Sequence, residues 1–167
     1  MPAFKLCYTI SMQMQEISLI KYSPDIHIKL LEKWLTNKDL MHNWGMPIFK
    51  IEGITPWTED PTRVILMVQN QKNGEIVGFV NFYQWDKENA KASRGTLIDS
   101  EYQNQGFGKA AIKESNRYAF EEMKLKKIEL YVEADNGRSR HVTEKLGYTF
   151  ERFDSKKKRY YYHMERK

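Results

Sequence analysis

The strongest constraint on the fold of this chain is a glycine-spaced turn, Gln103 to Lys109, which follows the apolar run 96–98 and opens onto a helical pattern. Gly106 and Gly108 carry no β-carbon, so several main-chain N–H groups can converge there on one anion. The helix that follows adds the positive end of its dipole and its unpaired first-turn donors. Two glycines often mark only a turn, but this strand–turn–helix order suits a pyrophosphate group.

A second strand and helix follow the first pair along the chain. Residues 127–132 (KIELYV) alternate as a strand does, and Asn136 begins a helical pattern that Gly147 ends. We expect the strands near Leu97 and Leu130 to be parallel neighbours in one sheet. A helix from about Lys109 to Met123 would then connect them, as a parallel crossover requires.

Together these segments resemble the GNAT superfamily of N-acetyltransferases. Residues 103–108 match its nucleotide motif, Q/R-x-x-G-x-G/A, and residues 136–148 match N-x-x-S-x-x-V-x-E-K-L-G-F/Y, which recurs in the branch typified by ribosomal-protein N-terminal acetyltransferases. The resemblance is close from Gly95 to Phe150 and weaker before Gly95. It implies an α/β (α+β) fold: a bent, mixed, mostly antiparallel sheet of six or seven strands, flanked by about four helices.

Residues 1–167 are expected to form a single domain, in which residues 1–15 extend beyond the core fold. Strand patterns at 16–21, 64–69 and 76–85 precede the glycine turn, and helical patterns begin at Pro24 and Asn37. Residues 159–165 are expected to form the strand that closes the sheet, with Lys156 to Lys158 as its exposed hairpin.

The segment from Trp44 to Pro61 is expected to be an irregular connection, because its prolines and glycines oppose a regular packed element. It is nevertheless rich in apolar side chains, including Trp44 and Trp57. Two interpretations stay open. Either these residues bind substrate as one wall of an amine cleft opposite the cofactor, or the aromatic side chains plug the end of the core.

Composition limits the partners and the compartment. The net charge of +5 and the basic run before Tyr160 raise nucleic acid as a partner, but a solvated strand end explains that run better. No run is long enough to span a membrane, and the single cysteine, Cys7, fits a reducing, cytoplasmic location. We therefore expect no nucleic-acid and no membrane partner, and a monomer or a homodimer.

The resemblance implies that acetyl-CoA is the acyl donor and assigns its binding residues by position. Main-chain groups of one strand end would hold the pantetheine arm, although two of these residues are also core candidates: Thr96, Leu97 and Ile98. The glycine turn would bind the pyrophosphate: Gln103, Asn104, Gln105, Gly106, Phe107, Gly108 and Lys109. On the other side of the cofactor, Asn136 would either bind the pantetheine or cap its helix.

The catalytic residues are less sharply indicated. The Ser139 hydroxyl would either approach the departing sulfur or only form hydrogen bonds with nearby main-chain groups. Thr143 stands where many GNAT enzymes carry a tyrosine that acts as the general acid. Glu129, Tyr131 and Glu133 share one strand face, and some family members carry a glutamate base at the position of Tyr131. Asp99 is expected to be a turn residue.

No metal site is expected, because the histidines have no ligand spacing, and Cys7 lies outside every motif, so transfer would be sequential. For the acceptor, the motif favours a peptide or protein N-terminus. The pattern around Trp34 and Trp44 also resembles aminoglycoside-modifying members, and loop acids could meet a polyamine or aminoglycoside: Glu52, Glu59 and Asp60. A catalytically silent acyl-CoA-binding module is the third alternative.

Overall fold

The computed structural model describes residues 14–167, and within them seven strands form one sheet in the order β1-β2-β3-β4-β5-β7-β6. The strands are β1 (Ile17–Lys21), β2 (Val64–Asn70), β3 (Ile76–Asp86), β4 (Lys91–Ile98), β5 (Lys127–Glu133), β6 (Thr149–Asp154) and β7 (Arg159–Glu165). The helices are α1 (Pro24–Leu35), α2 (Lys38–Trp44), α3 (Ile54–Thr58), α4 (Phe107–Glu121) and α5 (Gly137–Lys145), with 3-10 turns η1 (Ile51–Gly53) and η2 (Ser100–Tyr102). The mixed, mostly antiparallel sheet is confirmed, with five helices rather than four.

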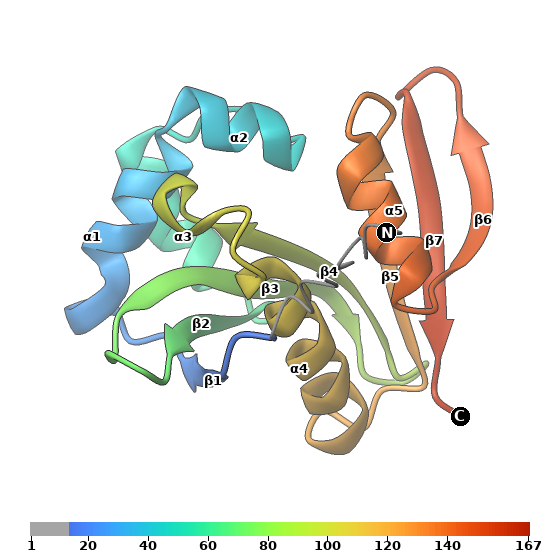
Figure 1. Ribbon diagram of the computed structural model, residues 1–167, viewed down its shortest axis with the longest axis horizontal. Coiled ribbons are helices and arrows are strands. Elements are labelled where there is room, and N and C mark those ends of the chain that lie inside the picture. Colours follow the sequence, from blue (N-terminus) through green and yellow to red (C-terminus); the bar gives the residue numbers. More distant parts are fainter. Residues whose placement is uncertain (1–13) are drawn as a thin grey trace, which may run out of the picture.

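The prediction that residues 159–165 close the sheet is wrong in one respect. β7 lies between β5 and β6, and β6 forms the edge. The reason is the hairpin: β6 and β7 are antiparallel neighbours joined by an exposed turn that includes Lys156 to Lys158. β7 pairs with β5 along its full length, so β6 can take only the outer position (Figure 1).

The predicted parallel pair is confirmed, and the pairing is short. β4 and β5 are the parallel neighbours, but only the residues from Lys91 to Ser93 pair with those from Lys127 to Glu129. Beyond this point the two strands diverge, although β4 continues to Ile98 and β5 to Glu133. α4 is the crossover, and it begins at Phe107, two residues earlier than expected, because Gly106 adopts a left-handed φ of 92° as its N-cap.

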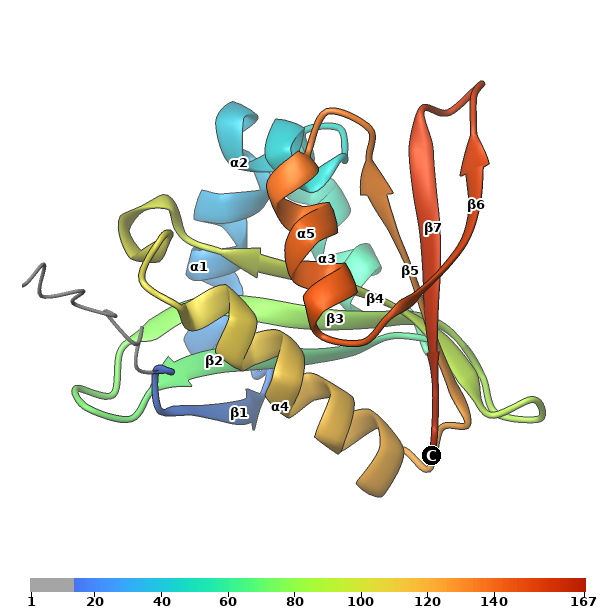
Figure 2. The same cartoon turned by 45° about the vertical axis from the view of Figure 1, so that its right-hand side comes forward.

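Alternation along the central strands divides the core between two helical layers. On β2, Leu66 packs in one cluster with α4 residues such as Ala111, whereas Met67 packs in the other cluster with α1 residues such as Leu31. Figure 2 shows α4 across one face of the sheet, with α1 to α3 behind the other face. The divergence of β4 from β5 therefore lies between two helix-covered faces.

The expectation of an irregular segment from Trp44 to Pro61 is wrong in part. Trp44 ends α2, and a 3-10 turn and α3 occupy residues 51–58. Pro56 is tolerated because it is the third residue of α3, where no N–H partner within the helix is needed. Asn37 caps α2 as expected, since its Oδ1 accepts from the N–H groups of Asp39 and Leu40.

Asp99 is more than a turn residue, because its carboxylate is buried and joins α1 to η2. Its Oδ2 accepts from Trp34 Nε1 at 2.7 Å and from Lys33 Nζ at 2.9 Å, both on α1. Its Oδ1 accepts from the main-chain N–H of Glu101 in η2. Burial would raise the pKa of Asp99, but the hydrogen bonds from Lys33, Trp34 and Glu101 outweigh it and hold that pKa below its ordinary value.

We expect Asp99→Asn to lower the free energy of unfolding at pH 7 by about 1–3 kcal/mol, because the buried Trp34 N–H and the Lys33 ammonium lose their anionic acceptor. A depressed carboxyl pKa stabilises the fold above the unfolded pKa of about 3.9, and this stability is lost as pH falls through the folded pKa. Denaturant unfolding at pH 7 and between pH 4 and 2 measures both effects. The acid-dependent loss should shrink in Asp99→Asn.

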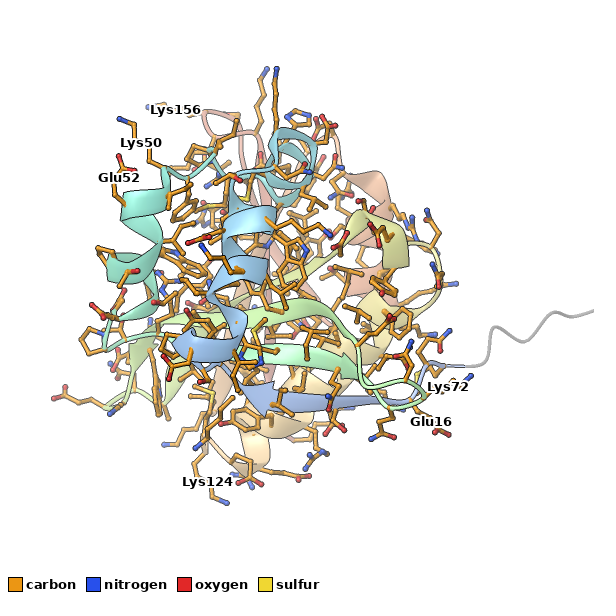
Figure 3. All side chains as sticks on the ribbon, turned by 90° about the vertical axis from the view of Figure 1, so that its left-hand side faces the viewer. Glu16, Lys50, Glu52, Lys72, Lys124 and Lys156 are labelled. Carbon is orange, nitrogen blue, oxygen red and sulfur yellow. The ribbon has the colours of Figure 1, made fainter. Side chains whose placement is uncertain are left out.

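The exposed residue Glu52 provides the control, because Glu52→Gln removes the same charge without removing a buried partner (Figure 3). An identical acid profile in wild type and Asp99→Asn would mean that other carboxylates determine the acid stability.

Candidate active site

One cavity of about 670 Å³ occupies the space where β4 and β5 diverge. Its lining comes from both faces of the sheet: the start of α4 and α5 on one side, and α2, α3 and the adjoining strands on the other. Figure 1 shows α2 and α5 on opposite sides of this region, with β4 between them. The cavity therefore connects the predicted pyrophosphate turn with the aromatic segment that the sequence proposed as a cleft wall.

The pyrophosphate turn lies at one end of this cavity. Gly106, Gly108 and Lys109 line it, and no side chain caps the N-terminus of α4, so the first-turn N–H groups keep no partner within the helix. Gln103 also lines the cavity, and its Nε2 donates to the main-chain oxygen of Ile98. An open helix N-terminus behind a left-handed glycine is the arrangement that anionic groups bind.

Two of the predicted turn residues face elsewhere. Phe107 is buried in the core against Tyr102, and Gln105 is exposed, with its side chain donating to the Glu101 carbonyl. Neither side chain lines the cavity. Asn104 does, and it contacts Arg138 of α5, which adds a second cation beside Lys109 near the turn.

Strand β4 supplies the wall that the resemblance assigned to the pantetheine arm. Thr96, Leu97 and Ile98 all line the cavity beyond the last pair with β5. Leu97 and Ile98 also belong to the two core clusters, so their role in the core is confirmed, and binding of the pantetheine arm stays a prediction. The buried Thr96 hydroxyl has no hydrogen-bond partner among the described residues, and it is free to meet a bound group.

The start of α5 forms the opposite wall. Asn136 caps this helix, because its Oδ1 accepts from the Ser139 N–H at 3.0 Å and its Nδ2 donates to the Asn43 carbonyl. The cap interpretation is therefore confirmed, while its side chain also lines the cavity. Ser139 and the buried Thr143 line the cavity as well, whereas His141 does not.

The other half of the cavity is aromatic, with one partly buried cation, Arg63. Trp44 and Trp57 line it and also pack against the core, so the wall and plug interpretations describe the same side chains. The guanidinium carbon of Arg63 lies 4.3 Å from the centroid of the Trp57 ring, and Nη1 of Arg63 donates to Asn81 Oδ1 at 2.9 Å. Burial lowers the pKa of Arg63 and raises the pKa of the neighbouring Tyr83 to about 12.

Strand β5 brings two of its three candidate residues to the cavity. Tyr131 lines the cavity, and its hydroxyl donates to Met46 Sδ at 3.4 Å. Glu133 also lines the cavity, and its Oε1 forms an ion pair with Arg159 Nε at 2.6 Å. Glu129 shares their strand face but not the cavity lining, and it pairs with Lys127 at 3.0 Å. Burial is the main factor that raises the pKa of Tyr131, so its phenol is neutral at pH 7.

The sequence interpretation missed several polar residues of the lining: Arg63, Asn81, Tyr83, Arg94 and Arg138. One signal was available for Arg94, since it stands between Ala92 and Thr96 on the inward alternation of a strand. The loop acids that suggested a cationic acceptor do not line the cavity. Asp60 pairs with Arg63, and Glu52 is exposed at the periphery (Figure 3).

Comparison with known proteins identifies the family. A sequence model described as the acetyltransferase (GNAT) domain matches residues 17–149. The chain belongs to the GNAT acetyltransferase family. The predicted resemblance is thereby confirmed, and it extends well before Gly95.

Two curated relatives and one solved structure illustrate the similarity. The chain is 32% identical over 76 residues to "Putative ribosomal N-acetyltransferase YdaF" of Bacillus subtilis, and 30% identical over 79 residues to spermidine N(1)-acetyltransferase of Escherichia coli K12. These alignments span 46% and 47% of this chain and 42% of each relative. The crystal structure of spermidine N-acetyltransferase from Vibrio cholerae in complex with CoA and spermine superposes with a TM-score of 0.77, over 89% of this chain and 93% of that one. At 18% identity this match shows the shared GNAT fold.

Residues 14–167 contain no group of three or more histidine, cysteine or acidic side chains placed to hold a metal ion. None of their helices is long and apolar enough to cross a membrane. Cys7 and most of the predicted extension, residues 1–13, lie outside the described residues.

We expect Gly106→Glu to abolish tight binding of CoA. Its carboxylate would enter the space where main-chain donors meet phosphate, and like-charge contact costs several kcal/mol, which corresponds to a loss of affinity of about a hundredfold or more. Isothermal titration calorimetry with CoA measures the change. Gly106→Ala is the matched control, because it carries the same backbone strain at φ 92° without the charge. Equal affinities in the folded Glu and Ala variants would remove the phosphate site from this turn.

Proposed function

We propose that this chain transfers the acetyl group of acetyl-CoA to a primary amine, with a peptide or protein N-terminus as the acceptor. The observation that supports it is the continuous cavity through the β4–β5 divergence, which joins an open helix N-terminus to an aromatic pocket. The donor residues would be the α4 N-terminus with Lys109 and Arg138 for the phosphates, and β4 for the pantetheine arm. When bound, acetyl-CoA supplies an activated thioester carbonyl.

The transfer needs no covalent enzyme intermediate. The amine nitrogen attacks the carbonyl carbon, an N–C bond forms, the C–S bond breaks, and the proton lost by the amine ends on the CoA sulfur. Holding a neutral amine against the thioester supplies much of the acceleration, because effective molarities in oriented reactions reach about 10⁵–10⁸ M. Glu133 is tied to Arg159, so we assign the loss of the amine proton to water in the cavity rather than to this carboxylate.

Two hydroxyl groups are proposed as proton donors to the leaving sulfur, Ser139 from α5 and Tyr131 from β5. The Tyr131 phenol is neutral at pH 7 and is intrinsically the stronger acid of the two. Ser139 lies one helical turn before Thr143, which stands where many family members carry tyrosine. Glu129 has no part in this proposal, because it lies outside the cavity lining.

The acceptor assignment follows from the charge of the aromatic half. A polyamine presents only cations and apolar methylene groups, and a cation would be repelled by the Arg63 guanidinium. A peptide N-terminus presents carbonyl oxygens next to its amine. Arg63 Nε is buried without a partner and could donate to such an oxygen, while Trp44 and Trp57 would pack against the first side chain.

A polyamine remains the second candidate. The spermidine acetyltransferases among the similar proteins favour it, and Glu133 and Asp135 line the same half of the cavity. A catalytically silent module would bind CoA and release no thiol with any amine. Monomer or homodimer remains a prediction for the assembly state.

We expect Ser139→Ala or Tyr131→Phe to lower kcat by about a hundredfold or more, with little change in CoA affinity, depending on which hydroxyl protonates the sulfur. Release of free CoA thiol under saturating substrates measures kcat, and calorimetry measures affinity. Thr143→Val serves as the comparison, since it removes a neighbouring hydroxyl of the same cavity. Unaltered rates in both variants would assign the proton to water.

A panel of amines tests the acceptor. We expect short peptides with a free N-terminus to release CoA thiol faster than spermidine does. Arg63→Met should raise the peptide KM by about tenfold and leave the spermidine KM unchanged or lower, because only the peptide loses a charge-assisted hydrogen bond. Trp57→Ala should raise the KM for the peptide and the KM for spermidine more than it raises the KM for acetyl-CoA. Faster transfer to spermidine in wild type would replace the peptide with the polyamine.

A further inference from the structure

Arg94 is a buried cation in the wall of the cavity, and the proposed transfer to an amine does not use it. It lies on β4, one residue beyond the last pair between Ser93 and Glu129. Its exposed fraction is 6%. Arg94 therefore stands where the divergence of β4 from β5 begins.

Among residues 14–167, this guanidinium contacts only neutral groups. Its Nη1 lies 3.4 Å from Ser115 Oγ and 3.5 Å from Asn116 Oδ1, both on α4, and its carbon lies 5.2 Å from the Tyr148 ring centroid. Its buried Nε has no hydrogen-bond partner in the part of the chain that the structure describes. Within residues 14–167 no carboxylate forms an ion pair with it.

Two of the other arginines near the cavity have a carboxylate partner, and the third, Arg138, is exposed beside the glycine turn. Arg63 pairs with Asp60 at 3.6 Å, and Arg159 pairs with Glu133 at 2.6 Å. A buried charge without a counter-ion is strongly unfavourable, and burial accordingly lowers the pKa of Arg94. An arginine nevertheless stays protonated at neutral pH. A ligand anion next to Arg94 would neutralise this buried positive charge.

The position of Arg94 along β4 indicates which part of a donor it would meet. Gln103 and the α4 N-terminus lie beyond Ile98, at the end of the strand proposed to lead to the phosphates. Arg94 precedes Ile98 by four residues, about 13 Å of extended chain. Thr96, with its unpartnered hydroxyl, lies between them on the same strand face. The acyl end of an extended pantetheine arm would therefore approach Arg94.

From this arrangement we propose that the cavity accepts an acyl-CoA whose acyl chain ends in a carboxylate, such as the succinyl thioester, with Arg94 as the partner of that carboxylate. The inference rests on the proposed function and specifies its donor. The amine still attacks the thioester carbonyl, the C–S bond breaks and the proton ends on sulfur, and the distal carboxylate is carried unchanged into the amide product. An acceptor carboxylate is the less suitable partner, because the aromatic half lies on the opposite sheet face and contains its own cation, Arg63.

Calorimetry with three donors tests the proposal on the wild-type protein. Succinyl-CoA and butyryl-CoA have acyl chains of equal length, and only the first carries a terminal charge. We expect succinyl-CoA to bind about tenfold or more tightly than butyryl-CoA, and at least as tightly as acetyl-CoA. Equal or weaker binding of succinyl-CoA relative to butyryl-CoA would overturn the proposal without any variant.

Arg94→Met keeps an unbranched, flexible side chain and removes the charged guanidinium. The ratio of succinyl-CoA to butyryl-CoA affinity should fall by about tenfold or more, and Arg94→Lys should recover part of it. Arg63→Met is the matched control, because it removes a guanidinium from the other face and should leave this ratio unchanged. An equal loss for all donors in Arg94→Met, with a lower melting temperature, would mean that Arg94 only clamps β4 to α4.

Thiol release separates this proposal from the proposed function. Selective binding of succinyl-CoA without transfer to any amine would keep the donor site and reject the amine transferase. Transfer from acetyl-CoA to peptides, with no preference for succinyl-CoA over butyryl-CoA, would keep the amine transferase and reject the carboxylate site at Arg94.

Discussion

The divergence of β4 from β5 is the constraint on which the rest of the site depends. Two parallel strands that stay paired satisfy each other's N–H and C=O groups, and here the pairing stops at Ser93 and Glu129. The main chain from Thr96 to Ile98 therefore faces a cavity instead of a neighbouring strand. A sheet opened in this way offers a ready line of donors and acceptors to an extended ligand.

Helix termini and buried polar side chains hold this opening in place. The left-handed Gly106 starts α4 without a capping side chain, so its donors face the cavity. Asn136 uses both ends of its amide, one to cap α5 and the other to bind the Asn43 carbonyl at the end of α2. Asp99 ties the turn before α4 to Trp34 and Lys33 of α1. These contacts link segments from three parts of the chain around one cavity.

The arginines at the cavity differ in how far neighbouring carboxylates neutralise them, and each therefore favours a different role. Glu133 and Arg159 neutralise each other, and their pairing removes a carboxylate that could otherwise serve as a base. Arg63 is balanced in part by Asp60 and by Asn81, and it still offers a buried Nε. Within the described residues, Arg94 has only a hydroxyl and an amide oxygen as partners. The two faces of the opening therefore differ in the ligand charge that they favour.

Local sequence determined the glycine turn before α4, the cap at Asn136, the alternation of β5 and the parallel crossover, because each depends on residues close together in the chain. It was also enough to identify the family, through motifs whose spacing reflects that local geometry. It misjudged residues 51–58, where the position of Pro56 within a helix decides whether proline is tolerated.

The tertiary structure alone decided which polar residues meet at the cavity. Glu129 and Glu133 are equivalent by alternation, yet only Glu133 lines the cavity, because the divergence of the strands begins after Glu129. Asp99 looked like a turn residue until α1 brought Trp34 and Lys33 against it. Arg94 is visible in the sequence as an inward cation, but the lack of a counter-ion depends on which side chains fold against it. Pairwise contacts between distant segments carry this information, and no local pattern encodes them.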